Sequence, residues 1–214
     1  MAISLRDELA GTGPTPTPFR ILCPPGWRRV APEALSTELT EVAAERLKSL
    51  GRPDLLLQLR SLAAMQHRSM LRANVLEAYL PPLVDGNAIP AVLTVSSFVL
   101  PAGADWGGAL NRLAKGAPIA IADFAETAMW VWTREERFED AEQPVVHSRA
   151  RHFVVPVPEG ERPTRALHFV FTVLDPGSQS ERDADAATDA SLTELLLDAA
   201  DLILSTMRWL PPKA

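Results

Sequence analysis

The chain has 214 residues, of which 47% are hydrophobic and 22% are charged, values close to those of ordinary globular domains. Its formal net charge of −6 argues against a broad nucleic-acid surface, because such a surface needs clustered positive charge. This length is sufficient for one domain whose core is stable without disulfides or bound metal ions. We expect a flexible leader over residues 1–18 and a single domain over residues 19–210.

Cys23 is the only cysteine in the sequence, which excludes an intramolecular disulfide and a zinc site built from several cysteines. Its position between an apolar stretch and two prolines favours a buried, inert thiol over a nucleophile. The first residues lack the apolar core of a secretory signal, and no run approaches the roughly 18 apolar residues of a membrane span. The expectation is a cytoplasmic protein without membrane insertion.

The leader ends in alternating prolines, which block helix and strand pairing alike. Residues 19–23 then favour a short strand, which Pro24-Pro25-Gly26 would stop. Trp27 follows that turn. We expect Trp27 to close one end of the core, since large aromatic side chains contribute much buried area, although a ligand-stacking role stays open.

Helical spacing of apolar residues predicts one helix over residues 37–50 and, after Gly51, a second from Pro53 to about Tyr79. His67 lies within the second helix and is expected to be a surface or packing residue. Met65 and Met70 are interpreted as adaptable packing residues.

Alternation predicts a strand over residues 89–100, and Asp105 is placed to cap a short helix from Trp106 to Lys115 that Gly116 ends. Residues 118–122 and 126–134 predict two further strands, or one broken strand. In the second, Trp130 and Trp132 share one face and Met129 and Val131 share the other. Such a strand is either covered on both faces or presents its tryptophans as a binding surface. The acidic run of residues 135–142 is interpreted as a solvated loop, from which a few ion pairs to Arg149 and Arg151 are possible.

Two alternating apolar runs between His152 and Val173 flank a polar loop and predict a β-hairpin. The expected register pairs residue 153 with 171, 155 with 169, and 157 with 167, which joins both apolar rows on one face. Pro156 and Pro158 cannot donate backbone hydrogen bonds, so the first strand is expected to be an edge strand or to be interrupted near its end.

Residues 178–189 are polar and are expected to form a mobile connection. Ser191-Leu-Thr-Glu194 matches a capping box and predicts the start of the last helix. Its expected sheet-facing stripe consists of Leu192, Leu195, Leu196, Ala199, Ile203 and Met207.

Signatures of known catalytic sites are missing from the sequence: it has no Gly-x-Ser-x-Gly elbow, no Gly-Lys-Ser/Thr phosphate loop and no dinucleotide fingerprint. The predicted register places His152 and His168 four positions apart along the ladder, roughly 13 Å, which is too far to share one metal ion. We therefore expect no catalytic residues, no metal and no cofactor, although acid–base chemistry by an unrecognised carboxylate or histidine stays open.

The ordered motifs Pro-Pro-Gly-Trp, Phe-Val-Val-Pro-Val-Pro-Glu-Gly, Leu-His-Phe-Val-Phe-Thr and Ser-Thr-Met-Arg-Trp-Leu together resemble a known class. This is the PsbP-like (Mog-type) α/β/α sandwich class of actinobacterial proteins, which includes the LpqN-type lipoproteins. The resemblance covers about residues 19–210. It implies an α+β fold in which a central antiparallel sheet carries helices on both faces, and it implies a non-catalytic binding or assembly factor. The chain is expected to depart from the LpqN type, because its first residues show no signal pattern and no apolar stretch precedes Cys23.

The leading hypothesis is a non-enzymatic protein-interaction or assembly module that acts on an unidentified protein partner, as a monomer or homodimer. Its expected binding residues are Trp106, Trp130 and Trp132. The alternative is a small-molecule-binding protein with an apolar pocket between sheet and helix.

Overall fold

The structure, a computed structural model, describes residues 18–32, 34, 35, 37, 74–84, 87–140, 143–160, 162–175 and 183–211. The predicted leader up to residue 17, residues 38–50 of the first predicted helix and residues 53–73 of the second lie outside the described residues. His67, Met65 and Met70 lie there as well.

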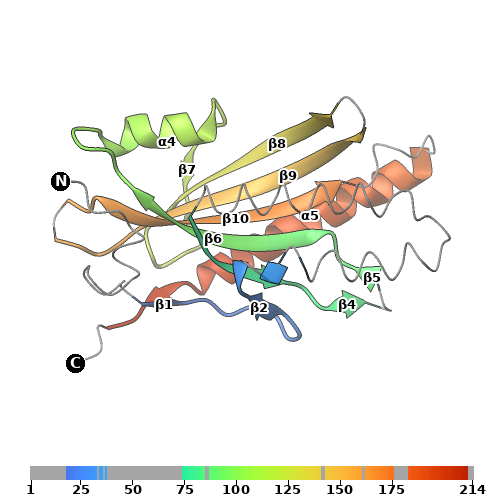
Figure 1. Cartoon of the computed structure of the whole chain (residues 1–214), viewed down its shortest axis with the longest axis horizontal. Helices are drawn as coiled ribbons and strands as arrows, with labels where there is room; N and C mark the ends of the chain where they lie inside the picture. Colours follow the sequence, from blue (N-terminus) through green and yellow to red (C-terminus); the bar gives the residue numbers. More distant parts are fainter. Residues whose placement is uncertain are drawn as a thin grey trace.

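The described chain forms short and long strands together with two helices (Figure 1). In chain order the elements are β1 (Phe19–Arg20), β2 (Arg28–Val30), β3 (Val75–Leu80), β4 (Leu83–Val84), β5 (Asn87–Ala88), β6 (Ala91–Val99), α4 (Trp106–Ala114), β7 (Ala120–Ile121), β8 (Trp130–Asp140), β9 (Gln143–Pro156), β10 (Arg165–Asp175), α5 (Asp183–Ser205) and β11 (Arg208–Trp209).

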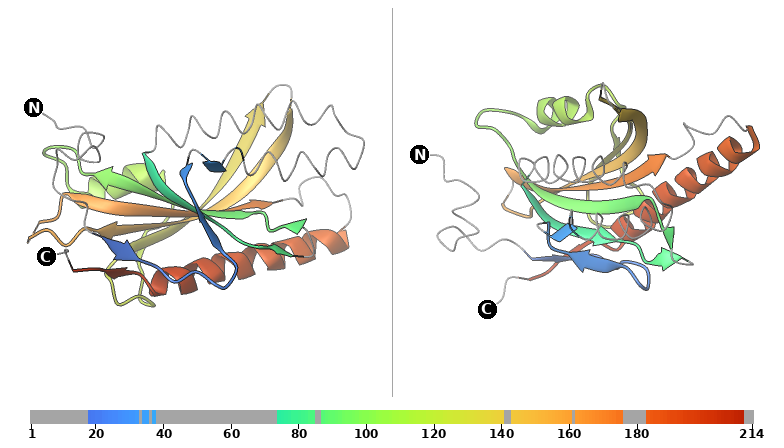
Figure 2. Two further views of the ribbon diagram at one scale, coloured as in Figure 1. Left: turned by 60° about the horizontal axis from the view of Figure 1, so that its bottom comes forward. Right: turned by 45° about the vertical axis from the view of Figure 1, so that its right-hand side comes forward.

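Seven strands form one antiparallel sheet in the order β2-β3-β6-β10-β9-β8-β7. Two small two-stranded sheets accompany it, β1-β11 and β4-β5. The chain therefore belongs to the α+β class, as the sequence predicted. Figure 2 shows α5 lying lengthwise along the large sheet.

The central hairpin is β9 and β10, but its register differs from the prediction by two residues. Phe153 lies opposite Phe169, and Val155 lies opposite Leu167. A shift of two residues leaves every side chain on its predicted face, so the apolar pattern could not detect it. In the observed register the pairing continues to the loop end of the hairpin, where the backbone N–H of Val157 donates to the carbonyl of Arg165 at 2.9 Å.

The prolines of β9 do not mark an edge strand, because β9 lies between β8 and β10. The strand ends at Pro156, in agreement with the predicted interruption. Beyond that residue the chain turns into the loop, where a missing N–H costs no ladder bond.

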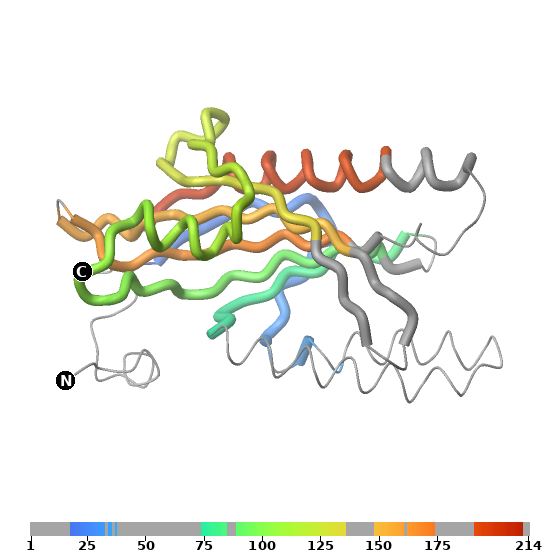
Figure 3. Tube along the Cα trace, turned by 90° about the horizontal axis from the view of Figure 1, so that it is seen from above, coloured from blue at the N-terminus to red at the C-terminus, as the bar shows by residue number. Residues whose placement is uncertain are grey.

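The described residues form three apolar clusters, of which the smallest contains Val30, Leu35, Ala78 and Leu80. The larger of the other two contains Phe153, Phe169 and Phe171 of the sheet, together with Leu197, Ala200, Ile203 and Leu204 of α5. A separate cluster joins Leu110 and Ala114 of α4 with Trp132, Val154 and Ala166. Figure 3 shows how α4 and α5 run relative to the strands.

Residues 75–80 form β3 and not the end of a helix, so the predicted extension of the second helix to Tyr79 is wrong. Asn74, at φ 50°, stands in the left-handed region directly before the strand. Ala78 and Leu80 are buried between β2 and β6, and this tertiary pairing prevails over the local helical pattern.

The acidic run is not a loop over its whole length, because residues 135–140 belong to β8. This strand begins at Trp130, whereas the prediction began at residue 126, and it pairs with β9 as far as Asp140 opposite Gln143. The first of the two predicted strands is reduced to Ala120 and Ile121. Met129 and Val131 do join the larger cluster, while Trp132 points to the other face.

Two predicted local structures are confirmed. Asp105 caps α4, since its Oδ1 accepts from the N–H of Gly108 at 2.8 Å, and Lys115 and Gly116 end it in the left-handed region. The strand predicted over residues 89–100 is β6.

Trp27 packs on the core, as predicted, with its ring centroid 6.0 Å from that of Phe171. The short strand predicted over residues 19–23 covers only Phe19–Arg20.

The last helix starts earlier and faces differently than predicted. It begins at Asp183, so residues 183–189 are helical and Ser191 lies inside the helix and not at its cap. Of the predicted inward stripe, Ile203 and Met207 are buried and Leu196 packs on the larger cluster, as predicted, whereas Leu192 and Leu195 are exposed. The buried positions also include Thr193, Leu197, Ala200 and Leu204. Because α5 has leucines on several sides, periodicity alone could not choose the inner one.

The orientation of α5 predicts opposite costs for two leucines two residues apart. Leu197→Ala should lower the free energy of unfolding by about 2–5 kcal/mol, because its side chain is buried in the larger cluster. Leu195→Ala, at 65% exposure, should change it by less than about 0.5 kcal/mol. Urea unfolding of both variants checks this, and equal costs would mean that α5 is rotated.

Candidate functional site

The predicted tryptophans gather at α4 and β8. The rings of Trp106 and Trp130 stack at 5.2 Å, and both residues are half-buried. Trp106 also donates from Nε1 to the carbonyl of Pro163 at 2.9 Å, which ties α4 to the loop between β9 and β10. Trp132 is only 2% exposed and packs beneath α4. The structure therefore brings Trp106 and Trp130 together near the surface and places Trp132 inside.

The two strand histidines meet, contrary to the predicted spacing. His152 Nδ1 lies 3.1 Å from His168 Nε2, because the observed register places them on neighbouring diagonal positions. Their ring planes are 21° apart, and Trp132 stacks on His152 with centroids 5.1 Å apart. The distance argument against a shared metal ion is thereby overturned. Among the described residues, however, no group of three or more potential ligands is assembled.

Burial keeps both histidines neutral. Loss of hydration lowers the pKa of His152 to about 3, with smaller contributions from His168 and the positive charge of Arg134. The same two causes, burial and then Arg134, lower the pKa of His168 to about 4. Neutral rings suit the contact, because one nitrogen must donate and the other must accept.

Two polar atoms of this group have no hydrogen-bond partner in the part of the chain that the structure describes. They are Trp132 Nε1 and His152 Nε2, and both are buried. Buried donors and acceptors are normally satisfied, so two such atoms on stacked neighbouring rings are unusual.

Cys23 carries no sign of activation. Burial raises the pKa of its thiol to about 11, so the sulfur stays protonated and weakly nucleophilic. This agrees with the interpretation of Cys23 as an inert thiol from the sequence.

The most distinctive surface feature lies on α5. We define the leucine stripe as Leu192, Leu195 and Leu202, which are 42%, 65% and 68% exposed. Together with half-buried Ala199 they recur at intervals of three, four and three residues, which places them on one face over about 15 Å of helix.

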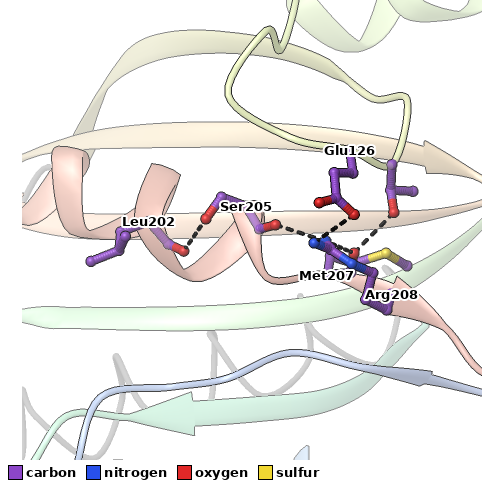
Figure 4. A network of polar contacts seen from close by, with 6 residues as sticks. Glu126, Leu202, Ser205, Met207 and Arg208 are labelled. Carbon is purple, nitrogen blue, oxygen red and sulfur yellow. Dashed lines mark hydrogen bonds and ion pairs between the residues drawn. The ribbon is translucent and has the colours of Figure 1, made fainter.

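The end of α5, which follows the leucine stripe, is fixed by polar contacts. Thr206 accepts from the N–H of Leu22 at 2.8 Å, and Thr127 donates to the carbonyl of Met207 at 2.9 Å. Arg208 donates to the carbonyls of Ser205 and Met207 and pairs with Glu126 at 2.9 Å (Figure 4). These contacts join the end of α5 to two separate parts of the chain, at Leu22 and at residues 126–127.

An acidic edge borders the leucine stripe; we define it as Glu194, Asp198 and Asp201. Glu194 is 2.5 Å from Arg149 Nη1, and Asp201 accepts two hydrogen bonds from Arg151 at 2.7 and 2.6 Å. Burial raises the pKa of Asp201, while Arg151 opposes that shift. Asp198, between them, is exposed and has no cation beside it among the described residues.

Sequence reasoning missed this surface because it assigned Leu192 and Leu195 to the core. The available signal was an excess of leucines over what one buried stripe needs. Positions 192, 195, 199 and 202 follow one seam, and 193, 197, 200 and 204 follow another.

No family model matches this chain, and no curated protein matches it. A solved structure from Bacteroides thetaiotaomicron VPI-5482 aligns with a TM-score of 0.36 and 12% identity over 64% of this chain and 39% of that one. The chain thus spans well under half of that protein's length, and a likeness this weak carries no argument. Of the described helices, none combines the length and apolarity needed to cross a membrane.

The histidine pair predicts acid sensitivity. Both folded pKa values lie below the ordinary value near 6.5, so the stability of the neutral pair is complete above about pH 6.5 and declines as the pH falls toward 4. At pH 5 the loss should be on the order of 2 kcal/mol per histidine.

Urea unfolding at pH 7.5 and pH 5 measures this loss. A variant with His152→Gln and His168→Gln should show a much smaller difference between the two pH values. If wild type and variant lose the same stability, other groups control the acid response.

Proposed function

We propose that this chain is a non-enzymatic protein-interaction or assembly module whose partner docks on the leucine stripe of α5. The observation that carries the proposal is the exposure of three leucines along one face of a helix whose other face is in the core. Single exposed leucines are common in soluble proteins, whereas aligned ones create a continuous apolar surface that a partner can cover.

The setting of the stripe favours binding without rearrangement. The end of α5 is held by Thr206, Thr127 and the ion pair of Arg208 with Glu126. Leu197, Ala200 and Leu204 pack in the larger cluster, so the helix is fixed on the sheet with the stripe outward. A rigid surface loses little conformational entropy when a partner binds. Trp106 and Trp130 stay predicted contact residues at a second, separate position.

The PsbP-like sandwich arrangement belongs to the same proposal. It is supported by the separate packing of α4 and α5 into different clusters of the sheet. A cytoplasmic location is part of the same proposal.

Site-specific photo-crosslinking in the native host tests the proposal. A photoreactive residue replacing Leu195 should give a defined protein adduct. One replacing Ile121, which is 74% exposed on β7, serves as the matched apolar control and should not give that adduct. Absence of an adduct at position 195, or the same adduct from both positions, would contradict docking on α5.

Small-molecule binding is a second candidate, favoured by the unpartnered Trp132 Nε1 and His152 Nε2 near the positive charge of Arg134. A small anion with a hydrogen-bond acceptor would satisfy the indole N–H. Thermal unfolding with a panel of carboxylates and phosphates should show stabilisation that Trp132→Phe removes, since this change deletes the N–H and keeps a ring. A panel without any shift, or an equal shift in the variant, would reject this candidate.

A further inference from the structure

We infer that the partner segment covering the leucine stripe is an amphipathic helix with basic side chains on one flank; this inference rests on the proposed function. Leu192, Leu195, Ala199 and Leu202 alternate intervals of three and four residues, the spacing with which helices pack along a shared seam. A partner helix with apolar residues at the same spacing can therefore lie along α5.

The charge of α5 beside the leucine stripe determines which side chains the flank of the partner helix should carry. Asp198 is three residues after Leu195 and four before Leu202, so its carboxylate adjoins the two most exposed leucines. Glu194 and Asp201 on either side are already paired with Arg149 and Arg151 of β9. Asp198 is thus the position at which an incoming lysine or arginine gains a new partner.

The same acidic edge argues against a second copy of this chain as the occupant. In an antiparallel pairing of two stripes, the acidic edges would face each other and repel. In a parallel pairing, each Asp198 would face the apolar side near Leu196 of the other copy and lose water without gaining a cation.

A membrane surface is disfavoured for the same reason. Helices that lie on membranes carry basic residues beside the apolar face, because cytoplasmic lipid surfaces are negative. The residue beside these leucines is an aspartate, Asp198, which has no cation beside it in the described part of the chain.

Two synthetic helical peptides of about 20 residues test the inference. Both carry leucines at the seam positions; one has lysines along its flanks and its twin has glutamates. The lysine peptide should bind the full chain about tenfold more tightly than the glutamate twin, measured by fluorescence anisotropy. Asp198→Lys should reverse the preference. The pair Leu195→Ser and Leu202→Ser should abolish binding, and Ile121→Ser should leave it unchanged.

The possible failures are distinguishable. If neither peptide binds while the crosslinked adduct at position 195 persists, the proposed function stands and the helical partner is rejected. Equal binding of both peptides, or no effect of Asp198→Lys, rejects the basic flank. Leucine-dependent binding of the chain to phosphatidylserine vesicles would replace the protein partner with a lipid surface.

Discussion

The pairing of β9 with β10 determines which side chains of the sheet meet. Phe153 lies opposite Phe169, and β10 continues the pattern to β6 by placing Phe169 opposite Val95. A register shifted by two residues would keep all three on the same face but would move His152 opposite residue 172, away from His168. The contact between the histidines, and the burial of Trp132 against them, therefore depends on this ladder.

The same ladder orients α5. Arg149 and Arg151 share a face of β9 with Phe153, and they reach Glu194 and Asp201 from there. Apolar burial of Leu197 and Leu204 sets which side of the helix faces inward, and the two ion pairs lie along its margin. Partly exposed pairs of this kind contribute little energy, so burial sets the orientation of the helix. Because the two arginines pair with Glu194 and Asp201, Asp198 is the carboxylate beside the leucine stripe that has no cation partner among the residues described. An outward apolar face is then a consequence of a helix that has leucines on both sides.

Local chemistry was predictable from the sequence where a few neighbouring residues decide it. Asp105 and Gly116 mark the start and the end of α4, as expected. The alternation of residues 91–99 correctly indicated the strand and its two faces. Choices between equivalent patterns were not predictable. The two-residue register shift preserves every face, and β3 was assigned to a helix because its apolar residues fit both periods. The leucine stripe was missed for the same reason: with two leucine seams on α5, only the packed sheet distinguishes inside from outside.

Solvent paramagnetic relaxation of leucine methyl groups tests the central claim most directly, that α5 turns an apolar face outward for a partner. In the free protein, a soluble relaxation agent should broaden the methyl signals of Leu192, Leu195 and Leu202 and spare those of Leu197 and Leu204. Addition of the lysine-flanked helix should then protect the first group selectively. Protection of Leu195 and Leu202 in the free chain would show that the face is already covered, and equal broadening of Leu197 would show that α5 is not packed as described; either result would contradict the account.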